Sequence, residues 1–155
     1  MKIVISSDHA GFVYKAVLIE MLSEEGYSIE DLGAYSEIAD DDYPDYAEKV
    51  AKALQNKEGE RGILICGSSV GVSVAANKFK GIRAAVCHDT YSAHQSVEHD
   101  DANILCIGQR VVGIALAKDI VRAFLNARFS DEARHKRRLA KIADIENTTM
   151  KGINL

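Results

Sequence analysis

Short apolar runs of strand length alternate with segments of helical periodicity along the whole 155-residue sequence. The run Ile63-Leu64-Ile65 is continuously apolar, which is typical of a strand buried on both faces of a parallel sheet. The pattern predicts strands near residues 2–6, 28–32, 62–66, 83–87 and 104–108. It predicts helices near residues 11–25, 44–56, 71–79, 90–98, 112–127 and 132–147.

Five βα units followed by one more helix favour an α/β protein. We expect a single-domain, three-layer α/β/α sandwich around a five-stranded, parallel, Rossmann-like sheet, with an extra C-terminal helix. The expected domain spans residues 1–147, and residues 148–155 are expected to form a C-terminal tail.

Charge and composition exclude several classes of function. Nineteen basic against 23 acidic residues give a net charge of −4, which offers no broad surface for nucleic acid or an anionic membrane. No apolar run approaches the roughly 18–20 residues of a membrane span, and the N-terminal apolar stretch meets Asp8 too soon for a signal peptide. Cys66, Cys87 and Cys106 show no zinc-binding spacing and fit a reducing compartment. We therefore expect a cytoplasmic protein without a metal, in which Cys87 and Cys106 are buried strand residues.

Reactive side chains follow three of the predicted strands. They lie in residues 6–11 after the first strand, in residues 66–71 after the third, and at residues 88–89 after the fourth. In open α/β sheets, ligands bind beyond the carboxyl ends of the strands, where the strand order reverses. This edge of the sheet is therefore the expected place of the functional site.

The segment Cys66-Gly67-Ser68-Ser69-Val70-Gly71 places a thiol before a turn of small residues. Backbone N–H groups of such a turn can converge on an anion. The segment is neither a Walker A loop nor a dinucleotide fingerprint, and Val72 stands where a cysteine-dependent phosphatase needs arginine. An anion-binding turn can lower the pKa of Cys66 and make it a base or nucleophile. The alternative, a buried cysteine before a tight turn, stays open.

Two histidine segments are further candidates. Asp8-His9 at the end of the first strand could bind sugar hydroxyls or shuttle a proton, or could form a solvated turn with an N-cap aspartate. His99 lies in the polar segment before the fifth strand, where a histidine can also be an ordinary surface residue.

A basic stripe opens the last helix. Arg134, Arg138 and Lys141 fall at helical spacing on one face, and in an acidic protein such a stripe suggests a specific anion such as phosphate. A solvated face paired with the acidic loops, including residues 37–43, is the alternative. Arg110, which follows the fifth strand, is a further candidate.

Seven segments in order give the chain a resemblance to a known family. They are Ser7-Asp8-His9-Ala10-Gly11-Phe12, Asp42-Tyr43-Pro44-Asp45-Tyr46-Ala47, Gly62-Ile63-Leu64-Ile65-Cys66-Gly67, Ala75-Ala76-Asn77-Lys78, Gly81-Ile82-Arg83-Ala84, Asp101-Ala102-Asn103-Ile104-Leu105 and Arg134-His135. Together they resemble the family of ribose-5-phosphate isomerase B and the galactose-6-phosphate isomerase subunits, over about residues 1–146.

The resemblance implies an aldose–ketose isomerase that works through a cis-enediolate, without a metal or organic cofactor. It implies that Cys66 is the catalytic base and that His99 assists opening of the furanose ring. The substrate-binding residues that it implies are Asp8, His9, Gly67, Ser68, Ser69, Val70, Gly71, Asp100, Asn103, Arg110, Arg134 and Arg138. Among these, residues 67–71 match the oxyanion loop, and the three arginines match phosphate-binding positions. The resemblance also implies a homodimer or dimer of dimers with active sites between subunits.

Two residues depart from the family pattern. Ser69 stands where the family usually has glycine, and Asp100 stands where many relatives carry asparagine. The expected reaction is the interconversion of ribose 5-phosphate and ribulose 5-phosphate in the non-oxidative pentose phosphate pathway. Alternatives are an isomerase for allose or galactose 6-phosphate, and a non-catalytic sugar-phosphate-binding module. The presence of both Cys66 and His99 favours the enzyme, since a binder needs neither proton-transfer group.

Overall fold

Five parallel strands form one sheet in the order β2-β1-β3-β5-β4 in the computed structural model, which describes residues 1–37 and 39–149. The strands are β1 (Lys2–Ser7), β2 (Ser28–Asp31), β3 (Arg61–Cys66), β4 (Ala84–Val86) and β5 (Ile104–Gly108). The helices are η1 (His9–Gly11, a 3-10 turn), α1 (Phe12–Glu24), α2 (Tyr43–Gln55), α3 (Val70–Ala76), α4 (Thr90–Asp100), α5 (Ile114–Asn126) and α6 (Ala133–Thr149). The predicted fold class is confirmed.

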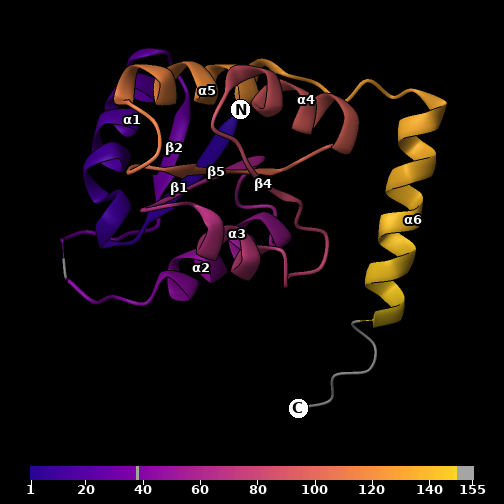
Figure 1. Ribbon diagram of the computed structural model, residues 1–155, viewed down its shortest axis with the longest axis horizontal. Coiled ribbons are helices and arrows are strands. Elements are labelled where there is room, and N and C mark those ends of the chain that lie inside the picture. The colour runs from indigo at the N-terminus through magenta and orange to yellow at the C-terminus, as the bar shows by residue number, and fades with distance from the viewer. Residues whose placement is uncertain (38, 150–155) are drawn as a thin grey trace.

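Helices cover both faces of the sheet and make three layers (Figure 1). Helices α1, α4 and α5 pack on one face, where Leu22, Val97 and Phe124 are fully buried. Helices α2 and α3 pack on the other face against Val4 and Leu64. Because the three central strands are covered on both sides, they are almost continuously apolar, as the sequence predicted.

Helix α6 stands beside this body, next to α4 (Figure 1). His135 is the one fully buried residue of α6 among those described, and Ile142 and Ile145 are 46% and 63% exposed. The helix runs to Thr149, so the first two residues of the predicted tail are helical. Residues 150–155 of that tail lie outside the described residues. No helix among the described residues is long and apolar enough to span a membrane.

Candidate active site

The site lies where the strand order reverses, between the carboxyl ends of β1 and β3. Strand β2 lies on one side of β1 and β3 on the other, so their crossover connections diverge at this point. A cavity of about 310 Å³ opens there. It is lined by Asp8, His9, Ala10, Tyr43, Cys66, Gly67, Ser68, Gly71, Arg110 and Val111. Six of the residues predicted to bind substrate and the predicted base, Cys66, therefore share one cavity.

The Cys66 thiol lies at the base of the turn that leads into α3. The Ser69 N–H donates to Cys66 Sγ at 3.0 Å, which stabilises a thiolate. Burial nevertheless outweighs this hydrogen bond and raises the pKa of the Cys66 thiol, and the nearby Asp8 carboxylate adds to the effect. The expectation that the turn lowers the pKa of Cys66 is therefore wrong for this chain. Desolvation raises the pKa of the thiol by more than the hydrogen bond from the Ser69 N–H lowers it.

Ser69 holds the turn in an unusual conformation. Its φ is +69°, in the left-handed region that favours glycine, and its side chain is fully buried. Ser69 Oγ donates to the Ser68 carbonyl and lies 3.2 Å from His88 Nε2, at the end of β4. Ser69 and Val70 do not line the cavity. Ser69, where the family usually has glycine, thus connects the turn after β3 to the segment that follows β4.

Asp8 and His9 begin η1 directly after β1. Asp8 is 6% exposed, and its Oδ1 accepts from the Gly11 N–H at 3.1 Å, so it is a buried N-cap rather than a solvated one. Burial raises the pKa of the Asp8 carboxyl. Gly11 is required here, because a Cβ at this position would lie 2.4 Å from the Ile65 carbonyl oxygen. This close approach of η1 to β3 brings Asp8 toward Cys66.

Asp41 was not among the predicted site residues and was placed only in an acidic loop, residues 37–43. Asp41 Oδ1 lies 2.5 Å from His9 Nδ1, and the Asp41 side chain is only 10% exposed. The His9 N–H also donates to both Asp41 carboxylate oxygens at 3.1 Å. The order of the strands gives an indication that Asp41 belongs to the site. The loop that follows β2 lies at the same carboxyl edge of the sheet as the loops that follow β1 and β3.

Asp8, His9 and Asp41 bring three possible metal ligands within 4.8 Å of one another. The His9 and Asp41 donor atoms are engaged in the hydrogen bonds described above. We therefore interpret the group as a hydrogen-bonded pair beside a capping carboxylate and assign it no metal.

Gly67 and Gly71 have no side chain, and this leaves space for two side chains that line the cavity, Arg110 and Tyr43. A Cβ on Gly67 would lie 3.4 Å from the Arg110 guanidinium carbon, so the Arg110 side chain lies against this residue. A Cβ on Gly71 would lie 2.8 Å from the Tyr43 ring. Tyr43 is a second residue that was not assigned to the site, although it lies in one of the segments that carry the resemblance.

Besides Ser69 and Val70, five more predicted site residues do not line this cavity within one chain: His99, Asp100, Asn103, Arg134 and Arg138. His99 is in the last turn of α4, so its expected place in a loop is wrong. Because β3 and β5 are parallel, with Gly62 opposite Ile104, the segment before β5 lies at the amino edge of the sheet. Strand β5 separates that edge from the carboxyl edge by about 13 Å.

At the amino edge, the Asn103 side chain makes hydrogen bonds within its own chain. Its amide oxygen accepts from the Arg83 N–H, and its amide nitrogen donates to the Gly81 carbonyl, both at 2.8 Å. His99 stacks on His135 of α6, with ring centroids 4.3 Å apart. Burial, followed by the nearby His99, lowers the pKa of His135. The start of α6, which carries Arg134 and Arg138, is thereby placed beside His99.

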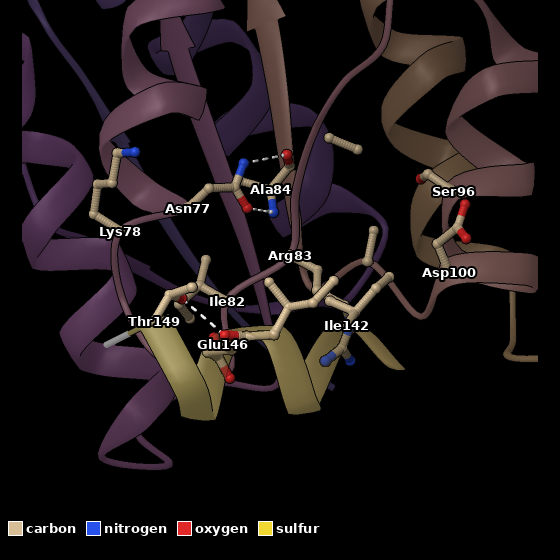
Figure 2. Close-up of a pocket in the computed structure, with 13 residues that line it drawn as sticks. Asn77, Lys78, Ile82, Arg83, Ala84, Ser96, Asp100, Ile142, Glu146 and Thr149 are labelled. Atoms are coloured by element: carbon tan, nitrogen blue, oxygen red, sulfur yellow. Dashed lines mark hydrogen bonds between the residues drawn. The ribbon is translucent and has the colours of Figure 1, made fainter. Parts of the chain in front are cut away.

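A larger cavity of about 510 Å³ lies between α6 and the segment that joins α3 to β4 (Figure 2). Ile82, Ile142 and Ile145 contribute apolar walls, and Glu146 accepts from the Gly81 N–H at 2.8 Å. Asp100 is the one predicted site residue that lines it. It contains neither the thiol nor the histidines, so the smaller cavity is the candidate active site.

The fold and site define a doubly wound α/β protein with a thiol and a turn of small residues at its switch point. The family model of Ribose/Galactose Isomerase matches residues 3–142, and the chain belongs to this family. Ribose-5-phosphate isomerase B of Escherichia coli is 48% identical over 94% of this chain and 96% of its own length.

Solved structures agree with the fold throughout its length. The Clostridium thermocellum ribose-5-phosphate isomerase B has a TM-score of 0.92 at 49% identity, over 96% of this chain and 99% of that chain. The Mycoplasma genitalium enzyme, solved with bound ribulose 5-phosphate, has a TM-score of 0.90 at 42% identity, over 96% and 97% of the two chains.

Proposed function

We propose that this chain interconverts ribose 5-phosphate and ribulose 5-phosphate through a cis-enediolate, as a step of the non-oxidative pentose phosphate pathway in the cytoplasm. The observation that carries the proposal is the Cys66 thiol at the wall of a cavity that also contains Asp8, His9 and Arg110. Relatives of closely similar length and fold are named ribose-5-phosphate isomerase B, and one was solved with ribulose 5-phosphate bound.

The reaction moves one proton between two adjacent carbons. The Cys66 thiolate takes the proton from C2 of the open-chain aldose, and the electron pair passes to the aldehyde oxygen to form the enediolate. The C2 hydroxyl proton passes to the C1 oxygen, and the proton taken by Cys66 returns to C1, which gives the C1 hydroxyl and C2 carbonyl of the ketose and restores the thiolate. The proton balance closes without an oxidant or reductant.

The turn after β3 supports both the base and the developing charge. The Ser69 N–H is directed at Cys66 Sγ and favours the thiolate. The remaining N–H groups of residues 67–71 are the proposed donors to the enediolate oxygen, since preorganised donors stabilise charge that develops in a transition state. Asp8 and His9 are the proposed partners of the sugar.

The phosphate would be held by arginines. Arg110 is in the cavity, whereas Arg134 and Arg138 are exposed on α6, away from Cys66 of the same chain. A phosphate group far from the reacting carbons supplies binding energy that orients the substrate. The guanidinium fork suits this group better than a lysine does.

We infer that a second copy completes each site, in a homodimer or a dimer of dimers. His99, which we propose as the ring-opening residue, lies at the amino edge, whereas Cys66 lies at the carboxyl edge of the same sheet. In a dimer of two antiparallel copies, the amino edge of one copy would lie at the cavity of the other. This edge includes Asp100 and Asn103. The exposed Ile142 and Ile145 of α6 are consistent with a helix that packs on a partner.

The proposal is tested by assaying the purified chain with ribose 5-phosphate, allose 6-phosphate and galactose 6-phosphate. We expect conversion of the pentose phosphate and loss of conversion in Cys66→Ala. Cys87→Ala is the matched control, because Cys87 is equally buried but lies outside the cavity. Preference for a six-carbon substrate would support the first alternative, and binding without conversion would support a sugar-phosphate-binding module.

A further inference from the structure

Both the ring and the backbone N–H of His9 form hydrogen bonds with the Asp41 carboxylate. Nδ1 lies 2.5 Å from Asp41 Oδ1, and the backbone N–H of His9 lies 3.1 Å from each carboxylate oxygen. Tyr46 of α2 also lowers the pKa of the Asp41 carboxyl. The contacts with the ring and the backbone of His9 hold the carboxylate against η1 and so fix the orientation of the imidazole.

The contact with Nδ1 determines what the other ring nitrogen offers. Because a carboxylate only accepts, Nδ1 carries a hydrogen, and Nε2 is an acceptor in the neutral ring and a donor in the imidazolium. Among the described residues, Nε2 has no hydrogen-bond partner, and the His9 side chain is 31% exposed in the wall of the cavity. An anionic substrate requires the donor form.

We propose that Asp41 is a positioning residue for the isomerase, which holds His9 as an imidazolium whose Nε2–H donates to the anionic sugar phosphate. This inference rests on the proposed function, because it names the chemistry through which that site recognises its substrate. Asp41 itself does not line the cavity. Its effect on the substrate passes through His9.

The charges around His9 agree with this role. The hydrogen bond from His9 to Asp41 raises the pKa of His9, and the Asp8 carboxylate adds to the effect. Arg110 opposes it from the segment after β5. Burial acts to raise the pKa of Asp41, but the hydrogen bonds from His9 and Tyr46 outweigh burial and keep that pKa below its usual value. The pair is thus favoured as carboxylate and imidazolium.

The first test follows the His9 ring by NMR as a function of pH, without substrate, in the wild type and in Asp41→Asn. Asp40→Asn is the matched control, since Asp40 has the same charge in the same loop, is exposed and makes no hydrogen bond to His9 among the described residues. We expect Asp41→Asn to lower the His9 midpoint by about one pH unit, because it removes a contacting negative charge. Asp40→Asn should leave it nearly unchanged. An unchanged midpoint in Asp41→Asn would overturn the proposal.

The second test compares KM and kcat for ribose 5-phosphate at pH 6 and pH 8. We expect Asp41→Asn to raise KM about tenfold at pH 8, with kcat nearly unchanged, because a charge-assisted hydrogen bond to substrate is lost. At pH 6 the increase should be smaller, since His9 is then protonated in both proteins. A merely structural Asp41 would give the same change at both pH values, and that result would contradict the inference.

The two tests separate this inference from the proposed function. If the wild type does not isomerise ribose 5-phosphate, the proposed function fails, while the NMR titration still decides whether Asp41 sets the charge of His9. The pH-dependent contrast is then measured as the Kd for ribose 5-phosphate. If Asp41→Asn changes the Kd by the same factor at pH 6 and pH 8, the result contradicts a positioning role for Asp41.

Discussion

At the scale of single residues, the environment of Cys66 sets how activity depends on pH. Burial raises the pKa of the thiol, so the protonated form dominates at neutral pH and only the thiolate can accept the C2 proton. We predict that kcat rises about tenfold per pH unit between pH 6 and 8. Cys66→Ala should lower kcat by about 10²- to 10⁴-fold in protein that remains folded by circular dichroism. A flat profile together with an active Cys66→Ala variant would exclude the thiol as base.

Ser69 leads to a prediction about stability. Ser69→Ala removes the hydrogen bonds to Ser68 and His88 but keeps the left-handed φ, so we expect a loss of about 1 kcal/mol in the free energy of unfolding. Ser69→Gly loses the same bonds but relieves a backbone conformation that costs roughly 1 kcal/mol, so its stability should be close to wild type. Urea unfolding of the two variants checks this, and a glycine variant less stable than the alanine variant would show that the conformation carries no strain.

Residue roles were only partly predictable from the sequence. Cys66, Asp8 and Arg110 follow strand ends, and the rule for parallel sheets places such residues at one edge. Asp41 was missed because an acidic loop has no periodicity that shows which carboxylate turns inward. The raised pKa of Cys66 was also missed, since desolvation depends on packing that the local turn does not encode.

At the scale of elements, the close contact of η1 with β3 positions Asp8 and His9. A Cβ at Gly11 would lie 2.4 Å and 2.5 Å from backbone atoms of Ile65, which cannot move without displacing the central strand. We predict that Gly11→Ala lowers the free energy of unfolding by about 3 kcal/mol or prevents folding. Gly113→Ala is the control, because a Cβ there meets no atom within 4 Å. Equal thermal unfolding midpoints for the two variants would contradict this packing.

The elements themselves were predicted well, for a physical reason. Each predicted strand is within one residue of its observed bounds, because buried parallel strands are marked by short, nearly continuous apolar runs. Helix α4 was cut short in the sequence analysis, since its last turn, Glu98-His99-Asp100, is polar and resembles a loop. The helix ends at Asp100, and the residue that follows it, Asp101, has a φ of +46°.

At the scale of the whole molecule, the separation of Cys66 and His99 predicts complementation between inactive variants. Cys66→Ala and His99→Ala should each be inactive as homodimers. When the two are mixed and allowed to exchange subunits, half of the dimers are mixed, and each mixed dimer has one intact site. We expect about one quarter of wild-type activity to return. Two sites that each drew both residues from one chain would give no recovery.

The order of elements could be predicted from the sequence, but their spatial relation to a second copy could not. Periodicity predicts that α6 is a helix, but it does not show that α6 stands beside the body (Figure 1) or that Ile142 and Ile145 are exposed. The expectation of sites between subunits came from the family resemblance. The parallel register of β3 and β5 now gives it a geometric reason.

The most direct test of the proposed isomerisation is an NMR time course of the purified chain with ribose 5-phosphate in D₂O. We predict that ribulose 5-phosphate forms with deuterium at C1, and that deuterium enters C2 of ribose 5-phosphate as the reaction reverses. Absence of both conversion and exchange, from folded protein with a reduced Cys66, would contradict proton transfer through an enediolate in this chain.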